Sequence, residues 1–229
     1  LIGDKGQLGK NIKIINKKKV NKKNYKIFNS SRYFFSNNNF IKNEKILQKL
    51  NIHTIINTRA FTDVDRAEID KNTSYQLNVN FVKNLSKICH KNNINLIHIS
   101  SDYVYSGRLI SATKEKSKTI PVNYYGQTKL KGEKQILKYN FKYFIIRTSK
   151  IYSKEANNFV KKTLEQINLG NNLKYLDDEF FCPTYALDLV KVIFKLIPKF
   201  KKMKKSQIFN FTGKEIFTPY NSARLILKL

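Results

Sequence analysis

A glycine-rich turn at the start of the chain constrains the fold more than any other feature. Gly3, Gly6 and Gly9 follow the apolar pair Leu1-Ile2 and precede a pattern that predicts a helix from Leu8. Glycine allows a positive φ and a close approach of the backbone to a pyrophosphate, and a helix N-terminus offers free N–H groups. The chain has only 8 glycines in 229 residues, so this spacing argues against a chance turn. The turn predicts dinucleotide binding.

The apolar periodicity predicts alternating strands and helices. Strands are expected at residues 24–28, 53–57, 95–100, 143–147 and 207–211, and helices at 42–50, 74–92, 125–139, 156–169 and 186–197, with a loop at 199–205. This order predicts an α/β fold, a Rossmann-like doubly wound parallel sheet with a smaller C-terminal substrate-binding lobe. We expect a dinucleotide-binding domain over residues 1–152 and a lobe over 153–229 that is interleaved with the sheet. Both ends look cut, so the lobe is expected to be incomplete.

The strong positive charge is interpreted as composition rather than as a nucleic-acid site. The formal net charge is +28, and 38 of the 44 basic residues are Lys, spread along a chain that also has 27 Asn and 27 Ile. Such usage is typical of AT-rich coding, whereas base readout relies on Arg. A functional basic patch is the alternative, and it would bind nucleic acid with a steep salt dependence. We expect no nucleic-acid partner.

The apolar runs and the cysteines indicate the kind of compartment. No run approaches the roughly 20 residues that a membrane-spanning helix needs, so no membrane partner is expected. The two cysteines, Cys89 and Cys182, form no disulfide framework. The sequence therefore predicts a soluble protein in a reducing, cytoplasmic setting.

The end of the second predicted strand bears on cofactor choice. An acidic residue that would hold the ribose of NAD is missing there, and Asn29-Ser30-Ser31-Arg32 stands in its place. Hydroxyl groups and the Arg32 guanidinium suit a 2′-phosphate, which favours NADPH. NADH stays the alternative, with Arg32 a plain surface charge.

Three side chains form a candidate catalytic group. Tyr125 and Lys129 lie four residues apart and share a helix face. The ammonium is expected to lower the phenol pKa, so that Tyr125 exchanges a proton with a carbonyl or alcohol oxygen. Ser101 ends an apolar strand and could hydrogen-bond the same oxygen. Each signal alone is weak, since Tyr and Lys could be a solvated pair and Ser101 a turn cap.

The glycine turn, this trio and the strand order resemble the extended short-chain dehydrogenases/reductases, and within them the dTDP-4-dehydrorhamnose reductases. The resemblance covers nearly the whole chain. Its most specific segments are residues 6–9, 56–68, 98–107 and 123–133, followed by 147–149, 157–159 and 183–184. It implies NADPH-dependent reduction of the C4 keto group of dTDP-4-dehydro-6-deoxy-L-mannose to dTDP-L-rhamnose.

The resemblance also implies a role for each matching residue. Tyr125 would donate the proton to the C4 oxygen, Lys129 would hold the nicotinamide ribose, and Ser101 would polarise the carbonyl. The sugar would contact Ser101, Asp102 and Lys150. The cofactor would be bound by Gly3, Gly6, Gln7, Leu8, Gly9, Arg32, Phe35, Ala60, Phe61, Thr62, Tyr125 and Lys129.

Departures from the family pattern keep other functions open. Lys150 replaces a sugar-contacting Trp, and Phe181 replaces a Gly. A reductase or epimerase of another nucleotide sugar is therefore one alternative, and a non-catalytic NADP-binding regulatory subunit is another. The family's magnesium has no acidic match at Asn11, so no metal is expected. A homodimer is the expected assembly if the chain self-associates.

Overall fold

The computed structural model describes residues 1–17, 25–29, 40–107 and 113–228. Its main sheet contains β1 (Thr54–Asn57), β2 (Asn95–Ser101), β3 (Tyr143–Thr148) and β6 (Gln207–Asn210) in the order β1-β2-β3-β6. All neighbouring strands are parallel. The predicted α/β fold with a parallel sheet is confirmed.

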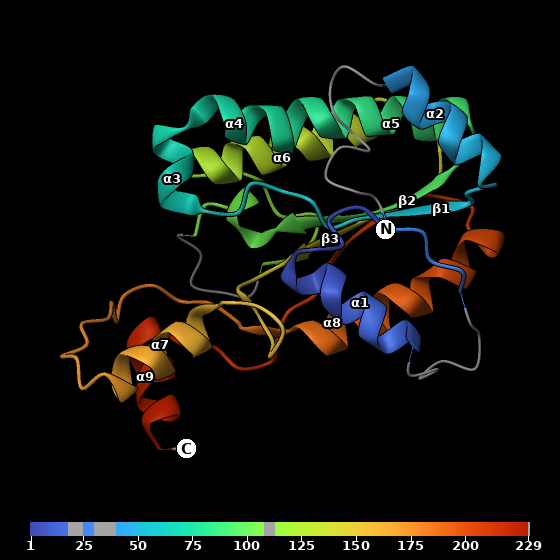
Figure 1. Cartoon of the computed structure of the whole chain (residues 1–229). Helices are drawn as coiled ribbons and strands as arrows, with labels where there is room; N and C mark the ends of the chain where they lie inside the picture. Colours follow the sequence, from blue (N-terminus) through green and yellow to red (C-terminus); the bar gives the residue numbers. More distant parts are fainter. Residues whose placement is uncertain (18–24, 30–39, 108–112, 229) are drawn as a thin grey trace.

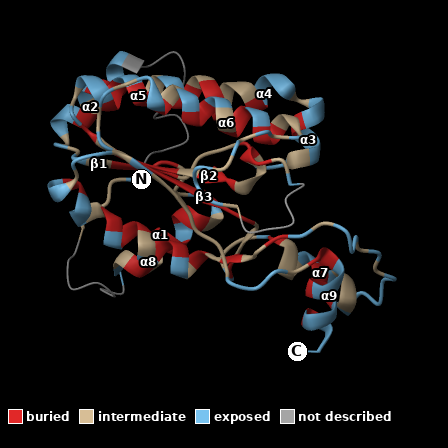
Figure 2. Ribbon diagram, turned by 180° about the vertical axis from the view of Figure 1, so that it is seen from behind, coloured by how far each residue is buried: buried red, intermediate tan, exposed pale blue. Residues whose placement is uncertain are grey.

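Helices cover both faces of this sheet (Figure 1). One face carries α2 (Phe40–Lys49), α5 (Phe81–Lys91) and α6 (Tyr124–Leu137), and the other carries α1 (Gln7–Lys17) and α8 (Ala186–Leu196). Because parallel strands are buried on both faces, they are nearly continuous in apolar residues. The core therefore has two layers, and Figure 2 shows buried residues on the helix sides that face the sheet.

A smaller part of the chain lies at the carboxyl ends of the strands (Figure 1). There α7 (Phe159–Asn168) contacts α9 (Pro219–Leu227), and β4 (Ile151–Tyr152) pairs with β5 (Thr184–Tyr185). The boundary at residue 152 stays a prediction. Both α8 and β6 lie C-terminal to it, yet α8 packs on the main sheet and β6 is one of its strands. No helix in the described ranges is both long and apolar enough to cross a membrane.

The predicted strand at residues 24–28 is wrong for its described part, residues 25–28. That segment is irregular, although the amino group of Leu1 donates to the carbonyl of Phe28 at 2.8 Å. Ile2 forms an isolated parallel bridge to Asn57. No strand ladder includes residues 25–28 in the described part of the chain.

The predicted loop at residues 199–205 is wrong over its first part. Residues 199–202 belong to a 3₁₀ helix, η3 (Ile197–Lys202), that continues from α8. Pro198 suits the first turn of a helix, and the Phe200 ring is buried 4.7 Å from the Phe144 ring. This contact with the sheet holds the lysine-rich segment in helical form.

The long helix predicted over residues 74–92 is interrupted. It consists of α4 (Lys71–Tyr75), a π-helical segment η1 (Gln76–Asn80) and α5, and α3 (Val64–Ile69) precedes it. π-helical segments are rare and occur frequently at functional sites. Here the interruption carries a buried asparagine, Asn78.

Candidate functional site

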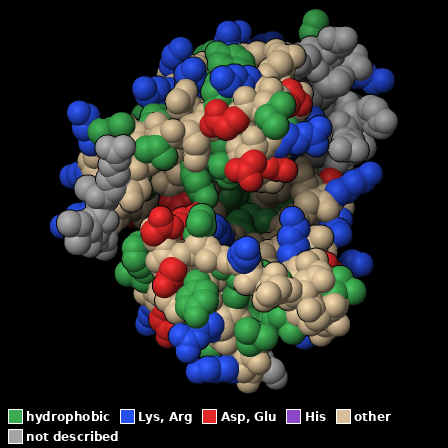
Figure 3. Space-filling view, turned by 90° about the vertical axis from the view of Figure 1, so that its left-hand side faces the viewer, with side chains coloured by type: hydrophobic (Ala, Val, Ile, Leu, Met, Phe, Trp, Pro, Cys, Tyr) green, Lys and Arg blue, Asp and Glu red, His purple; other side chains and the backbone are tan. Residues whose placement is uncertain are grey.

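The three predicted catalytic residues lie together at the carboxyl edge of the sheet. Ser101 is the last residue of β2, and Tyr125 and Lys129 lie in the first half of α6. All three side chains are buried. Figure 3 shows this edge of the molecule, which is hollowed between its upper and lower parts and has charged side chains along the rim.

Backbone contacts position helix α6. Asn123 caps it by accepting a hydrogen bond from the N–H of Gly126 at 2.8 Å. A Cβ atom at Gly126 would lie 2.1 Å from the carbonyl oxygen of Tyr103, and one at Gly132 would lie 2.3 Å from that of Asn78. The helix therefore rests directly on the backbone of two neighbouring segments.

Burial sets the protonation of Tyr125. It raises the pKa of the phenol to about 12, a hydrogen bond with Ser101 acts in the opposite direction, and the Asp102 carboxylate adds to the rise. The expected lowering of this pKa is wrong for the protein alone. Tyr125 is therefore a protonated phenol at neutral pH and can donate a hydrogen bond.

Lys129 is buried beside the strand that carries Ser101. Its ammonium donates to the carbonyl of Ile99 at 2.8 Å. Burial lowers the pKa of Lys129 to about 8, and the Glu133 carboxylate partly opposes this. Lys129 therefore keeps most of its charge at neutral pH and loses it in mildly alkaline solution.

The segment after Ser101 supplies further polar groups. The Ser101 hydroxyl donates to Asp102 at 3.1 Å and accepts from the N–H of Tyr103. Burial raises the pKa of Asp102, although the hydrogen bond from Ser101 opposes this. The Tyr103 ring meets the Tyr125 ring edge-on, with centroids 5.6 Å apart.

Two residues from the smaller part of the chain reach this segment. Glu179 accepts a hydrogen bond from the Tyr103 hydroxyl at 3.3 Å and pairs with Lys150 at 3.0 Å. Lys150 also lies over the ring of Phe181, 4.1 Å from its centroid. The predicted sugar residue Lys150 is thus beside the site, and Tyr103 and Glu179 were missed because their contact joins residues 76 positions apart.

The glycine turn fits a pyrophosphate. Gly3 has a φ of +82°, and a Cβ atom there would lie 2.6 Å from Thr58 Oγ1, so no other residue suits this position. The N–H of Gly6 donates to the carbonyl of Gly3, and helix α1 begins at Gln7. The N–H groups of Gln7, Leu8 and Gly9 belong to its first turn, which has no intrahelical acceptors for them.

The predicted cofactor loop is held by a residue that the sequence analysis missed. Asn78 accepts from the N–H of Phe61 at 2.9 Å and donates to its carbonyl at 3.1 Å. It also donates to Thr128 on α6. A buried Asn on an apolar helix face is the signal that could have found it. The side chain of Phe61 packs near Tyr125, Ala60 is half-buried, and Thr62 is exposed.

Two predicted cofactor residues, Arg32 and Phe35, lie outside the described residues. Arg59, in the described part, stacks its guanidinium on the Phe81 ring at 4.9 Å. The preference between NADPH and NADH therefore stays a prediction.

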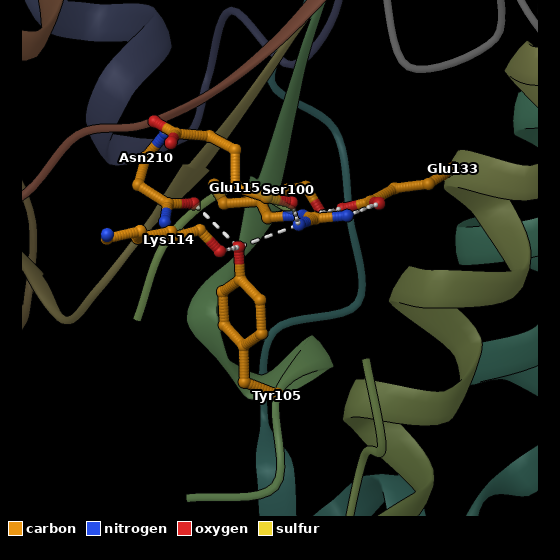
Figure 4. Close-up of polar contacts among 7 residues, drawn as sticks. Ser100, Tyr105, Lys114, Glu115, Glu133 and Asn210 are labelled. Carbon is orange, nitrogen blue, oxygen red and sulfur yellow. Dashed lines mark hydrogen bonds and ion pairs between the residues drawn. The ribbon is translucent and has the colours of Figure 1, made fainter. Parts of the chain in front are cut away.

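A buried ion pair lies directly behind the site (Figure 4). Arg147 on β3 donates to both carboxylate oxygens of Glu133 on α6, at 3.0 and 2.7 Å. Ser100 donates to the same carboxylate, and Arg147 also donates to the Tyr105 hydroxyl at 2.7 Å. Tyr105 in turn donates to Asn210 at the end of β6. The network joins β2, β3, β6 and α6 beneath Ser101.

The fold and the site together define a Rossmann-like α/β protein with the Ser–Tyr–Lys group of the short-chain dehydrogenases/reductases. A family model described as "RmlD substrate binding domain" matches residues 1–229, so the chain belongs to that family.

Relatives of known name support this membership. The dTDP-4-dehydrorhamnose reductase of Aggregatibacter actinomycetemcomitans is 32% identical over 180 residues, which cover 78% of this chain and 61% of the relative. That of Shigella flexneri is 36% identical over 61% of this chain and 47% of the relative. The chain thus matches about half to three fifths of the length of these curated relatives.

Solved structures agree. A dTDP-4-dehydrorhamnose reductase from Bacillus anthracis, in complex with NADP, has a TM-score of 0.89 at 28% identity and covers 99% of this chain and 78% of that one. MoeE5, in complex with UDP-glucose and NAD, has a TM-score of 0.83 at 16% identity over 99% of this chain and 80% of that one. This second likeness shows the fold alone.

Proposed function

We propose that the chain is an NADPH-dependent reductase that converts dTDP-4-dehydro-6-deoxy-L-mannose to dTDP-L-rhamnose by reducing its C4 keto group. One observation carries the proposal. Tyr125, a protonated phenol, lies one helical turn from Lys129 at the carboxyl edge of the sheet, where β2 ends at Ser101 and where the glycine turn also lies. Substrates bind at this edge in open α/β sheets.

The chain's own residues would bind the cofactor at three places. The N–H groups of Gln7 and Leu8 beside Gly6 would bind the pyrophosphate, residues 60–62 would border the nicotinamide side, and Lys129 would hold the ribose. NADPH, when bound, supplies the hydride. Asn78 would hold residues 60–62 in place through Phe61.

The group formed by Ser101, Tyr125 and Lys129 would direct the proton. Ser101 would hydrogen-bond the keto oxygen and orient it toward Tyr125, which would donate its proton as charge develops on that oxygen. The neighbouring Lys129 ammonium would then stabilise the phenolate until solvent reprotonates it. Asp102 and Lys150 would contact the sugar.

The test is NADPH oxidation by this chain with dTDP-4-dehydro-6-deoxy-L-mannose. Tyr125→Phe should lower the rate by about 10²- to 10⁴-fold, as expected for loss of a general acid, and should retain NADPH binding. Tyr139→Phe, two residues past the C-terminal end of α6, is the matched control and should keep the rate. A folded, NADPH-binding wild type that oxidises no NADPH with this sugar would exclude the proposed reaction.

A second candidate is reduction of another nucleotide sugar, which the Lys150–Glu179 pair favours because it places charges beside the sugar position. Turnover of a different keto sugar by the wild type would support it. If the chain is instead a non-catalytic regulatory subunit, it should bind NADPH and copurify with a partner protein but oxidise no NADPH. A homodimer and a cytoplasmic location complete the proposal, and light scattering and cell fractionation test them.

A further inference from the structure

Glu179 stands out among the charged side chains around the hollow because it touches two elements at once. Its Oε1 atom pairs with the Lys150 ammonium at 3.0 Å and accepts from the Tyr103 hydroxyl at 3.3 Å. Tyr103 follows Asp102 directly and packs edge-on against the Tyr125 ring. Glu179 therefore lies next to the place where the proposed proton transfer occurs.

The carboxylate has room for a further donor. Both of these contacts are made through Oε1, and none of the residues that the structure describes donates a hydrogen bond to Oε2. The side chain is 39% exposed, so the carboxylate is in part accessible to solvent or to a ligand. An ionised carboxylate only accepts hydrogen bonds, so it suits a ligand hydroxyl.

Its neighbours hold Glu179 in this orientation. Lys150 is itself fixed over the Phe181 ring, 4.1 Å from the centroid. Burial is the main cause that raises the pKa of Tyr103, and the Glu179 carboxylate adds to it, so the Tyr103 hydroxyl stays a donor at neutral pH. A carboxylate held by two partners loses little freedom when it binds a third, which favours selective recognition.

We propose that Glu179 determines sugar specificity by accepting a hydrogen bond from the hydroxyl next to the keto carbon. The inference rests on the proposed function, which places the C4 oxygen at Tyr125. In a 4-keto-6-deoxy sugar the neighbouring carbon that bears a hydroxyl is C3. Lys150 and Tyr103 act as positioning residues for Glu179.

The experiment compares two substrates, dTDP-4-dehydro-6-deoxy-L-mannose and its analogue with hydrogen in place of the C3 hydroxyl. Glu179→Ala should lower kcat/KM for the parent sugar by about 10- to 100-fold, the range for a hydrogen bond to a charged group. The value for the analogue should change less than about threefold, since the analogue has no C3 donor. Glu179→Gln, which keeps an acceptor oxygen, should recover part of the loss.

Asp178 is the neighbouring exposed carboxylate, and Asp178→Ala is the matched control. It should leave kcat/KM unchanged for both substrates. NADPH affinity and the thermal unfolding midpoint of Glu179→Ala verify that the variant is folded. Equal losses for both sugars would indicate a loop-holding role and would overturn the inference.

Failure of the proposed function gives a different result. If the wild type oxidises no NADPH with the parent sugar, calorimetric binding of both sugars to wild type and Glu179→Ala replaces the kinetics. A preference for the parent sugar that disappears in the variant would support the role of Glu179 alone. Equal affinities, or no binding of either sugar, would overturn it.

Discussion

Glu133 and Arg147 form a two-point ion pair inside the protein, with their side chains only 2% and 5% exposed. A buried pair of this kind adds little stability over an apolar pair of the same size, but loss of one partner leaves an uncompensated charge. Glu133→Ala should therefore lower the free energy of unfolding by about 3–5 kcal/mol, measured by urea denaturation.

The exposed Lys191–Asp188 pair provides the control for this variant. Both of its side chains are about half exposed, so Asp188→Ala should change stability by less than about 1 kcal/mol. The double variant Glu133→Leu/Arg147→Met should recover much of the loss, because no charge is then left without a partner. A loss in Glu133→Ala no larger than in Asp188→Ala would contradict the prediction.

Asn78 joins the loop at residues 60–62 to helix α6 through Phe61 and Thr128. Asn78→Ala leaves the N–H and carbonyl groups of Phe61 without these partners in a buried place. We expect a loss of about 2–3 kcal/mol in unfolding free energy. Under the proposed function, NADPH should also bind more weakly, which fluorescence titration would measure. In Asn80→Ala, which removes an amide that donates to Gln76 instead, NADPH affinity should stay unchanged.

Lys129 should make stability rise with pH. Burial lowers its pKa from 10.5 in the unfolded chain to about 8 in the folded protein. Below pH 8 both states hold the proton, and between about 8 and 10.5 only the unfolded state does, so stability increases over that window. Relative to Lys129→Met, wild type should gain about 2 kcal/mol between about pH 7 and 9.5. Parallel pH profiles of the two proteins in urea unfolding would rule this out.

His98 should make the folded protein less stable at acidic pH. It is fully buried, its Nδ1 accepts from the Asn57 amide at 3.0 Å, and burial, with the Lys129 charge, holds its pKa well below 6.5. As the pH falls below that value, the unfolded chain binds a proton that the folded protein does not. Stability should drop by up to about 1.4 kcal/mol per pH unit.

The variant His98→Gln isolates this effect because it keeps an acceptor for Asn57 and has no titrating group. Its urea midpoint should fall less than that of wild type between pH 6.5 and 5. His53→Gln, at an exposed position, controls for removal of an imidazole as such. The same acid slope in His98→Gln and wild type would show that another group is responsible.

Local pattern was enough for the elements that the site is built on. The i,i+4 spacing of Tyr125 and Lys129 and the apolar run ending at Ser101 predicted one helix and one strand, and parallel strands end at the same edge. The trio is therefore brought together by topology alone. Positive φ at Gly3 follows from the turn, where a side chain would meet Thr58.

Local sequence pattern could not predict the electrostatic effects that depend on tertiary contacts. The pKa of Tyr125 depends on how deeply α6 lies against the segment that follows Ser101. Burial there raises this pKa, whereas the i,i+4 neighbour Lys129 had predicted a lowering. The Tyr103–Glu179 contact and the Glu133–Arg147 pair join segments whose separation in sequence carries no signal. The strand predicted at residues 24–28 is likewise absent from residues 25–28, because an apolar run alone does not show whether a neighbouring strand pairs with it.

The two glycine contacts of α6 have a consequence for tolerance to mutation. Gly126 and Gly132 lie six residues apart on the helix, a span of about 9 Å at 1.5 Å per residue, and each rests on the backbone carbonyl of a neighbouring segment. Two such contacts fix the position of the helix along its axis and its rotation about that axis. They depend on no particular side chain. The position of the Tyr125 hydroxyl is then insulated from changes in the surrounding side chains. Many surface positions can therefore change to Lys, Asn or Ile without displacing the Tyr125 hydroxyl, provided that Gly126 and Gly132 are kept.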